Sequence, residues 1–356
     1  MPQLSAIKSA DAATALARAL EIQAAGAVPL IIDPAAPISS ETLNTALPET
    51  AAWAALTSGT TGEPKIVVRS AESWRVAFPE LDRQLGLELG DGLWMPVHQV
   101  SSMALFTAAW AHDSELELVI PTKEDSGIAR TQVAHLTPIW LERLVDLIDG
   151  GQSSTIHTVL VGGDRLSDQL KRRANAAGLR VICYVGATEL SLVAWDLGNG
   201  MCPFPGVSTT VIDGQLWVSS PQVALEVIGG SLPCKRIDEV DFTTVGDRVT
   251  EHEGVLEFLG RTDGAIITAG ATVIPSDVET VINQHDEVRA SLVLGQPDSV
   301  LGHRVVSWFE GTAEIAQLRK WVRSRLPKAA RPVQWHRVDR LARTASGKVR
   351  RIAPTT

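Results

Sequence analysis

The sequence predicts an α/β fold, with a large N-terminal α/β domain that contains a β-rich subdomain and a small α+β C-terminal domain. Three observations predict it. Helix patterns alternate with short apolar runs in the first half of the chain, closely spaced strand patterns follow from about residue 205, and the net charge changes sign near residue 261. At about 150 residues per domain, 356 residues allow roughly two domains.

The first half of the chain has the rhythm of a mainly parallel sheet covered by helices on both faces. Each helix pattern is followed by a buried apolar run, and strands that alternate with helices of about 12 residues favour parallel pairing. Ser9 or Asp11 can cap the first helix and Gly26 can end it. The helix patterns are 9–25, 136–148 and 166–177, and the strand patterns are 27–33, 158–161 and 179–185.

The β-rich subdomain begins with a hairpin pattern. Residues 209–212 and 215–218 are strand-like and are joined by Asp213-Gly214, a dipeptide typical of two-residue turns. Strand patterns at 240–249 and 255–259 continue in this style. After Gly260 we expect helices to return, ending in a basic stretch over 319–351.

The charge distribution predicts a domain boundary. From Arg261 onward there are 15 basic and 9 acidic side chains, a net charge of +6, whereas the first 260 residues hold 17 basic and 32 acidic ones, a net charge of −15. We therefore expect domains at 1–262 and 263–356. The overall charge of −9 argues against a general nucleic-acid binder, which would need a basic surface.

Several other classes of protein are disfavoured. The N-terminus lacks a signal-peptide core and no run of about 18 apolar residues suggests a membrane span. Cys183, Cys202 and Cys234 form no CxxC pair, so we expect three reduced, mostly buried thiols in a cytoplasmic protein. No Cys/His cluster predicts a zinc site, and GxSxG is absent.

The strongest local signal is the segment 57–65, TSGTTGEPK. Glycines permit backbone conformations in which successive N–H groups converge on an anion, hydroxyls add donors, and Lys65 adds a compact positive charge. The pattern is not GxxxxGK[ST], and the lysine leads into an apolar strand rather than a helix. The segment therefore predicts a phosphate-binding loop of another kind.

This loop resembles that of the adenylate-forming superfamily, which comprises acyl- and aryl-CoA ligases, peptide-synthetase adenylation domains and luciferases. Further segments resemble the motifs of that superfamily in the same order, and together they cover most of the chain. They are 25–34, GATE at 186–189, GQLWV at 214–218, TVGD at 244–247, GRTD at 260–263 with 266–279, and RTASGKVR at 343–350.

The resemblance implies an ATP-dependent enzyme in which a carboxylate attacks the α-phosphorus of ATP and a thiol then attacks the acyl carbon. The protein would contribute positioning and charge stabilisation. Thr188 would contact the α-phosphate, Glu189 would bind Mg²⁺, and Lys348 would bridge the carboxylate and the α-phosphate. The residues implied to bind ATP or the thiol substrate are Thr57, Ser58, Gly59, Thr60, Thr61, Gly62, Lys65, Gly186, Asp247, Arg261 and Gly270.

The resemblance also implies a hinge and an acyl pocket. The small domain would rotate at Asp263, withdrawing Lys348 and presenting the strand around Gly270 to the thiol. The pocket would be formed by His98, Gly162, Gly163 and Arg165. Arg69, Arg165 and His98 are candidates to receive a further anionic group on the substrate.

Four features depart from the superfamily pattern. Val185 stands where an aromatic residue usually stacks on adenine, and Tyr184 comes one position early. Val245 alters the spacing of the TGD motif, and Ile267 replaces a common lysine. Only 56 residues precede the phosphate loop, so the N-terminal subdomain is reduced.

The short N-terminal part and His98 are most similar to compact o-succinylbenzoate–CoA ligases of actinobacterial type, from menaquinone biosynthesis. The implied substrates are a carboxylic acid, ATP with Mg²⁺, and CoA. Two alternatives stay open: a different acid ligase, including a free-standing enzyme that loads a carrier protein, and a non-catalytic relative that binds nucleotide. The sequence leaves the choice between a monomer and a homodimer open.

Overall fold

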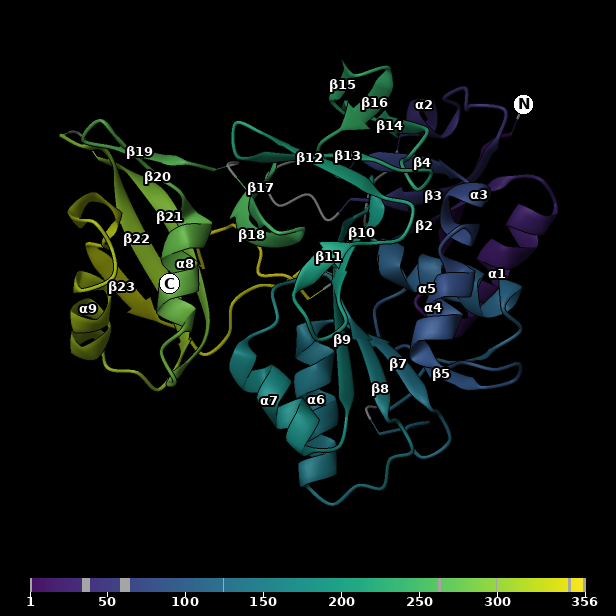
Figure 1. The fold of residues 1–356 in the computed structure, drawn as a ribbon, viewed down its shortest axis with the longest axis horizontal. Coiled ribbons are helices and arrows are strands. Elements are labelled where there is room, and N and C mark those ends of the chain that lie inside the picture. Colours follow the sequence, from purple (N-terminus) through teal and green to yellow (C-terminus); the bar gives the residue numbers. More distant parts are fainter. Residues whose placement is uncertain are drawn as a thin grey trace.

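The computed structural model describes residues 2–354 except for 34–38, 58–64, 124, 262–263, 299 and 345–346, and Ser40 only in its backbone. The strands form four sheets (Figure 1). Three sheets lie in a large unit that ends at residue 261, and the fourth lies in a small unit that begins at residue 264. Among the described residues, no helix is both long enough and apolar enough to cross a membrane.

The first sheet carries the two ends of the predicted phosphate loop. Its strand order is β1–β2–β3–β4–β14, with β1, β2 and β3 parallel and the last two pairings antiparallel. Helix α1 (Ala12–Ala24) connects the first two strands, and Asp11 caps it by accepting a 2.7 Å hydrogen bond from the Thr14 N–H, which confirms the predicted cap. The strands are β1 (Leu4–Lys8), β2 (Val28–Ile32), β3 (Ala51–Leu56), β4 (Ile66–Ser70) and β14 (Glu226–Ile228).

The second sheet confirms the prediction of mainly parallel pairing. Five neighbouring strands, β6–β5–β7–β8–β9, are parallel, and β10 and β11 extend the sheet antiparallel. The strands are β5 (Gly92–Trp94), β6 (Glu117–Val119), β7 (Val133–Leu136), β8 (Thr158–Val161), β9 (Arg180–Ala187), β10 (Ser191–Asp196) and β11 (Met201–Pro203).

Helices cover this sheet on both faces. Helix α5 (Ser102–Asp113) is buried from Met103 to Ala111, and it packs in one core with side chains of both the first and the second sheet. Helices α6 (Pro138–Asp149) and α7 (Asp168–Ala176) belong to the core on the opposite face. The remaining helices of this unit are α2 (Ser40–Leu43), α3 (Glu72–Arg75) and α4 (Phe78–Leu85).

The predicted helix at 136–148 was wrong at its start. Leu136 ends strand β7, and the helix begins at Pro138. Proline disfavours helical backbone in the residue before it, and Thr137 is accordingly extended with φ −96° and ψ 163°. The apolar pattern therefore ran across the end of a strand and into the next helix.

The third sheet contains the predicted hairpin. Strands β12 (Ser208–Ile212) and β13 (Gln215–Ser219) pair antiparallel, and both turn residues have positive φ, 52° at Asp213 and 73° at Gly214. The single strand expected at 240–249 is two strands, because Gly246 turns the chain with φ 88°. The other strands are β15 (Cys234–Ile237), β16 (Val240–Thr243), β17 (Asp247–His252) and β18 (Val255–Arg261).

The small unit is centred on strands, so the expected return of helices after Gly260 was only partly right. The long strands β21 (Val288–Asp298) and β22 (Gly302–Gly311) pair antiparallel along their length. Helices α8 (Pro275–Asn283) and α9 (Ile315–Arg323) pack on this sheet in a core of their own. Strands β19 (Ile266–Thr268), β20 (Ala271–Val273) and β23 (Gln334–Arg337), and the short 3₁₀ helix η1 (Lys328–Ala330), complete the unit.

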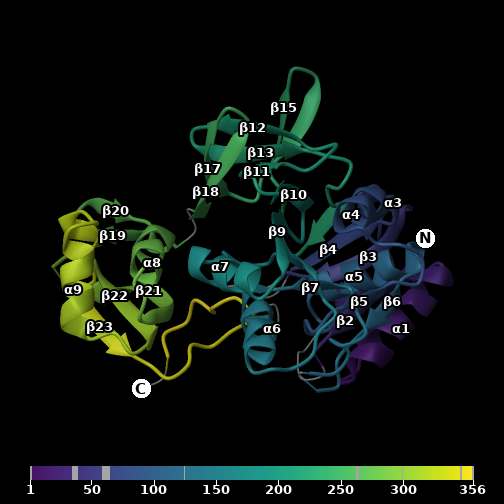
Figure 2. The ribbon, with the colours of Figure 1, turned by 60° about the horizontal axis from the view of Figure 1, so that its bottom comes forward.

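The last residues leave the small unit and reach the large one. Figures 1 and 2 show this segment, in yellow, running from β23 to the side of α6. Residues 339–351 are named here the C-terminal strap. The strap folds back on itself through a bridge between Arg343 and Val349, so that Lys348 lies near its tip.

The cysteines carry no disulfide bond. Cys183 and Cys202 are half-buried, whereas Cys234 is exposed on the edge strand β15, so the expectation of mostly buried thiols was wrong for Cys234.

Candidate active site

The two ends of the predicted phosphate loop meet at the edge of the first sheet. The Thr57 N–H donates to the Lys65 carbonyl oxygen (2.9 Å), and the Lys65 N–H donates to Thr57 Oγ1 (3.3 Å). The loop therefore closes the antiparallel pair β3–β4. The predicted ligands Ser58, Gly59, Thr60, Thr61 and Gly62 lie outside the described residues.

Lys65 lies against a glycine that the sequence analysis did not single out. A Cβ atom placed on Gly230 would lie 2.6 Å from Lys65 Cδ and 3.0 Å from its Nζ. With glycine at 230, the lysine side chain can lie against the backbone just after β14, and a larger residue there would require that side chain to shift.

Thr188 and Glu189 occupy the turn between β9 and β10, and Gly186 permits that turn. A Cβ atom on Gly186 would lie 2.1 Å from the Ser191 carbonyl oxygen, so the strands can approach this closely only at glycine. Ser102, at the first turn of α5, lies with its Oγ 3.1 Å from Thr188 Oγ1. The turn is thus held from the second sheet and from α5.

Arg69 of β4 binds the backbone of the same turn. Its Nη1 donates to the carbonyl oxygens of Thr188 (2.9 Å) and Glu189 (3.2 Å), and its Nη2 donates to the carbonyl oxygen of Gln222. Burial lowers the pKa of the guanidinium to about 9, against the opposing effect of the Glu189 carboxylate, so the group stays cationic at neutral pH.

The interpretation of Arg69 as a receiver of a substrate anion was wrong. The residue is 0% exposed, and its Nη1 and Nη2 donate to backbone carbonyl oxygens. We identify it as a positioning residue for the turn that carries Thr188 and Glu189. The signal that could have indicated this is a single charged residue in the otherwise apolar strand β4.

Asp247 and Arg261 lie directly opposite one another in the antiparallel pair β17–β18. Opposite charges at such positions attract, and the pairing places these two predicted ATP-binding residues at one end of the third sheet. The altered TVGD spacing is accommodated locally, since the Gly246 N–H donates to Thr244 Oγ1 (3.0 Å), and Thr244 Oγ1 donates to the Leu216 carbonyl oxygen (2.6 Å).

Tyr184 points away from the face that Val185 presents, because side chains alternate along a strand. Its hydroxyl hydrogen-bonds to His135 Nε2 (2.9 Å), and His135 Nδ1 lies 2.7 Å from Thr107 Oγ1. His135 is 1% exposed, and burial lowers its pKa to about 3, so the ring is neutral. Burial also raises the pKa of Tyr184.

The Tyr184 ring packs on the turn at Gly162 and Gly163, two of the residues predicted to form the acyl pocket. This turn is named here the acyl turn. A Cβ atom on Gly162 would lie 2.2 Å from Tyr184 Cζ, so only glycine fits at this position. Gly163 has φ +87°, and a Cβ atom there would lie 3.3 Å from Thr137 Cγ2. The two glycines therefore let the backbone pass between the Tyr184 ring and Thr137, which precedes α6.

Arg165 does not face the acyl turn, although it was predicted to help form the acyl pocket. Its Nη1 donates to Thr280 Oγ1 of α8 (2.9 Å), and the side chain is exposed where the large unit faces the small unit. Arg248 and Asp277 form a second contact between the units, with an N–O distance of 3.2 Å. The structure therefore gives Arg165 a bridging contact in place of the predicted pocket contact.

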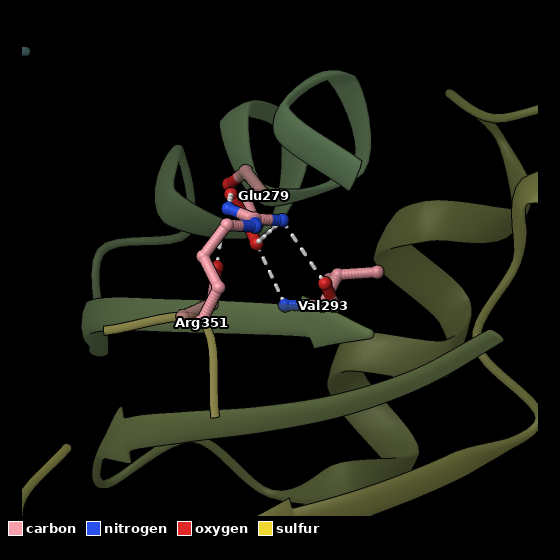
Figure 3. A network of polar contacts seen from close by, with 4 residues as sticks. Glu279, Val293 and Arg351 are labelled. Carbon is pink, nitrogen blue, oxygen red and sulfur yellow. Dashed lines mark hydrogen bonds and ion pairs between the residues drawn. The ribbon is translucent and has the colours of Figure 1, made fainter. Parts of the chain in front are cut away.

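The strap is anchored to the small unit at both ends, and Figure 3 shows the anchor near its C-terminal end. Near its start, Glu310 accepts hydrogen bonds from the Leu341 N–H (2.7 Å) and from Arg343 Nη2 (3.2 Å). Near its end, Arg351 donates to both carboxylate oxygens of Glu279 (3.0 and 3.2 Å), and the Val293 N–H donates to the same group (2.7 Å). Burial raises the pKa of Glu279, and the Arg351 charge opposes this shift.

These anchors present Lys348 to the large unit. The Thr344 N–H donates to the Lys348 carbonyl oxygen (2.8 Å), so Thr344 and Lys348 lie side by side at the base of what is named here the Lys348 loop. A Cβ atom on Gly347 would lie 3.4 Å from Thr137 Oγ1 and 3.0 Å from Ile139 Cγ2. Thr137 thus contacts both the acyl turn and the strap, and its hydroxyl is buried without a hydrogen-bond partner among the described residues.

A pocket of about 530 Å³ opens beside the strap, within the size range of small-molecule sites. His98 lies in its wall, together with other residues of the segment after β5, the start of α6 and residues of the strap. The structure therefore brings His98, the start of α6 and the Lys348 loop together.

Two other predicted site residues, Gly270 and Asp263, are not placed beside this pocket. Gly270 is exposed in the turn between β19 and β20, and Figures 1 and 2 place that turn at the end of the small unit remote from the strap. The predicted hinge, Asp263, lies outside the described residues.

Comparison with known proteins gives related enzymes. The chain is 27% identical over 341 residues to an uncharacterized acyl–CoA ligase of Bacillus subtilis, covering 88% of this chain and 70% of that protein. It is 26% identical to the 2-succinylbenzoate–CoA ligase of Escherichia coli, covering 79% and 63%, and 28% identical to a probable 2-succinylbenzoate–CoA ligase of Mycobacterium tuberculosis, covering 83% and 82%.

Solved structures share the fold. A variant of E. coli MenE with bound OSB-AMS superposes with a TM-score of 0.80 at 21% identity, covering 95% of this chain and 84% of that one. ATP-bound MatB from Rhodopseudomonas palustris gives a TM-score of 0.83 at 20% identity, covering 98% and 87%. The predicted fold class is confirmed by these two likenesses.

Family comparison covers most of the chain. Residues 277–348 match the AMP-binding enzyme C-terminal domain. Residues 4–254 match the AMP-binding enzyme family, and the chain therefore belongs to that family.

Proposed function

We propose that the protein is an AMP-forming acid–CoA ligase that acts on 2-succinylbenzoate. The observation that carries the proposal is the docking of the Lys348 loop on the start of α6, beside the acyl turn and a pocket of about 530 Å³. The relatives named 2-succinylbenzoate–CoA ligase support the choice of acid.

In the proposed reaction, a carboxylate oxygen of the acid attacks the α-phosphorus of ATP, and pyrophosphate leaves. CoA sulfur then attacks the acyl carbon, the thiol proton is released, and AMP leaves. Lys348 would neutralise the negative charge that meets at the α-phosphorus in the first step, and the groups from Thr57 to Lys65 would hold the departing pyrophosphate.

The residues present fit a magnesium ion bound mainly through nucleotide and water. Among the described residues no three Asp, Glu, His or Cys side chains gather into a metal site. Glu189 alone would supply a carboxylate from the turn that Arg69 holds, which suits Mg²⁺ because it usually keeps several waters and phosphate ligands. The ion would offset the charge of the phosphates.

We further propose that residues 1–262 and 263–356 act as two domains, with rotation near Asp263. The present orientation brings Gly347, which precedes Lys348, against the start of α6, and it keeps the β19–β20 turn with Gly270 away from that site. This arrangement suits adenylate formation. Rotation of the small domain would withdraw Lys348 and present Gly270 for thioester formation.

The test of the proposed acid is a panel of carboxylic acids with ATP, Mg²⁺ and CoA, read by mass spectrometry and pyrophosphate release. We expect an acyl-CoA from 2-succinylbenzoate and none from simple fatty or benzoic acids. An acyl-adenylate that reacts with a carrier protein but not with CoA would contradict the acceptor, and absence of pyrophosphate from every acid would contradict the enzyme itself.

The test of the two orientations is Lys348→Ala. We expect loss of adenylate formation by at least about 100-fold, because a charge aimed at the transition state is removed. Thioester formation from added acyl-adenylate should be largely intact. Equal loss of both half-reactions would contradict the assignment.

A further inference from the structure

The pocket beside the strap is cationic. Among the described residues that form its wall there is no Asp or Glu, whereas four Lys or Arg residues and His98 are present. Two of the cations, Lys123 and Arg143, come from the large unit, and two, Arg340 and Arg343, come from the strap. A pocket with this composition selects for negative charge.

The two arginines nearest the protein core are already engaged. Arg343 pairs with Glu310 at 3.2 Å and donates to the Gly347 carbonyl oxygen, and Arg143 lies over the Trp140 ring with its Cζ 4.7 Å from the ring centroid. In contrast, the exposed side chains of Lys123 and Arg340 form no ion pair within the described part of the chain. One cation from each unit is therefore available to a ligand.

The rest of the wall is apolar. Ile120, Ile139 and the half-buried Trp140 ring face the same space. A ligand that matches this pocket has a hydrocarbon or aromatic body and a negative group, since apolar walls bind the body and cations orient it.

The pocket adjoins the reacting end of the proposed site. Gly347 belongs to its wall and precedes Lys348. Thr137, which is 1% exposed, lies next to Gly347, and its hydroxyl has no hydrogen-bond partner among the described residues. A substrate with one carboxylate beside Lys348 would extend along α6 toward Lys123 and Arg340.

We propose that this pocket receives the second carboxylate of a dicarboxylic acid substrate, through Lys123 of the large unit and Arg340 of the strap; the proposal rests on the proposed ligase function. Because Arg340 and Lys348 lie on the same strap, the second carboxylate also favours the orientation that delivers Lys348. A ligand shifts such an equilibrium only by its differential affinity for the two states, and Arg340 supplies that difference.

The test compares two acids that differ in the second carboxylate. Pyrophosphate release without CoA is measured with 2-succinylbenzoate and with 3-benzoylpropionate, which keeps the succinyl chain and the ring but lacks the ring carboxylate. The variants are Lys123→Met, Arg340→Met and the double variant. Lys328→Met is the matched control, since Lys328 is an exposed cation of the small unit outside the pocket.

We expect kcat/KM for the diacid to fall about tenfold in each single variant, as for loss of a charge-assisted hydrogen bond. The value for 3-benzoylpropionate should change by less than about twofold, and Lys328→Met should leave both acids unchanged. Equal loss for both acids, or no loss for the diacid, would overturn the proposal. The complete reaction with CoA is assayed as well, and a rise in the KM for CoA with no change in the CoA-free step would also overturn the proposal, because it would assign the pocket to a CoA phosphate.

A binding measurement separates this proposal from the proposed function. Calorimetric titration of 2-succinylbenzoate into the wild-type protein and the double variant needs no turnover. Loss of binding in the variant supports the pocket even if no acid is turned over, and equal binding in the two proteins overturns the pocket even if the ligase activity is established.

Discussion

Arg69 carries a positive charge into a part of the molecule from which solvent is excluded, and it uses that charge on three backbone carbonyls. The carbonyls belong to Thr188, Glu189 and Gln222, which lie 119 to 153 residues further along the chain. A single side chain thereby joins the first sheet to the turn that is proposed to hold the α-phosphate and Mg²⁺.

Replacing Arg69 with Met should reduce the free energy of unfolding by roughly 2–4 kcal/mol, because buried carbonyls lose their donors. Urea denaturation measures this. If Arg69 also positions Glu189, the Mg²⁺ concentration that half-saturates adenylate formation should rise. Arg75→Met is the control: the Arg75–Asp113 pair is largely exposed, and its loss should cost less than about 1 kcal/mol. If a folded Arg69→Met protein needs the same Mg²⁺ concentration for adenylate formation as the wild type, Arg69 does not position Glu189 and contributes only to stability.

His135 should make stability sensitive to acid. Its pKa is lowered to about 3 in the folded protein, against an ordinary value of 6.5, so between these pH values the unfolded chain binds a proton that the folded protein does not. Stability is therefore lost as the pH falls through 6.5. From pH 7 to pH 5 the loss should be about 2 kcal/mol.

The measurement is urea denaturation of the wild-type protein and His135→Gln at both pH values. Glutamine does not titrate and keeps a polar group near Tyr184 and Thr107, so the variant should lack this part of the loss. An identical pH dependence in the two proteins would contradict the neutral, buried state of His135.

At the scale of elements, the strap depends on its anchors. Its described residues form one β-bridge, between Arg343 and Val349, and its two ends bind Glu310 on β22 and Glu279 on α8. Glycine at 347, with φ 89°, completes the loop that presents Lys348. The position of Lys348 is thus set by strands and a helix distant from it in sequence.

Glu310→Gln should weaken the start of the strap, since the 6%-exposed carboxylate accepts from both Arg343 and the Leu341 N–H. We expect adenylate formation to fall about tenfold or more, with thioester formation from added acyl-adenylate less affected, because only the first step uses the docked strap. The control is Glu314→Gln, whose carboxylate forms an exposed 3.8 Å pair with Arg337. Parallel loss of both half-reactions would contradict this role of the anchor.

At the scale of the whole molecule, two units of opposite net charge face each other. The first 260 residues carry −15 and the remainder +6, although the ion pair between them has the reverse polarity, Arg248 of the large unit with Asp277 of the small unit. The attraction between the two units therefore comes from their net charges acting over a long range, and not from the Arg248–Asp277 pair alone.

Salt should loosen this arrangement. Long-range attraction is screened over about 10 Å at 0.1 M ionic strength and over about 3 Å at 1 M. We expect the radius of gyration from small-angle X-ray scattering to rise between low and high salt, as the small unit samples more orientations. A radius that does not change with ionic strength would show that short-range contacts alone hold the units.

Much of the fold could be predicted because its signals are local. The Asp11 cap, the Asp213-Gly214 turn and the alternation of helices and strands depend on residues close in sequence, and the structure confirms them. The prediction was wrong where one apolar run crossed two elements, at Leu136 and Pro138, and at the small unit, where strands form the centre.

The candidate site could be predicted as a set of residues but not as a geometry. The order of the motifs indicated the family, which residues 4–254 confirm. No pattern indicated which carbonyl groups Arg69 would bind, that Tyr184 would pack on Gly162, or that Arg165 would contact Thr280. Each of these outcomes depends on partners more than twenty residues away.

The sequence by itself determined the α/β class, the charge division near residue 261 and the motifs that identify the family, because periodicity, turn chemistry and spacing act over a few residues. Only the tertiary structure decided which charges are buried, which glycines admit a neighbouring side chain and which cations gather beside the strap. Those properties arise where segments from distant parts of the chain pack together, and packing decides which polar groups find partners and which stay open to a ligand.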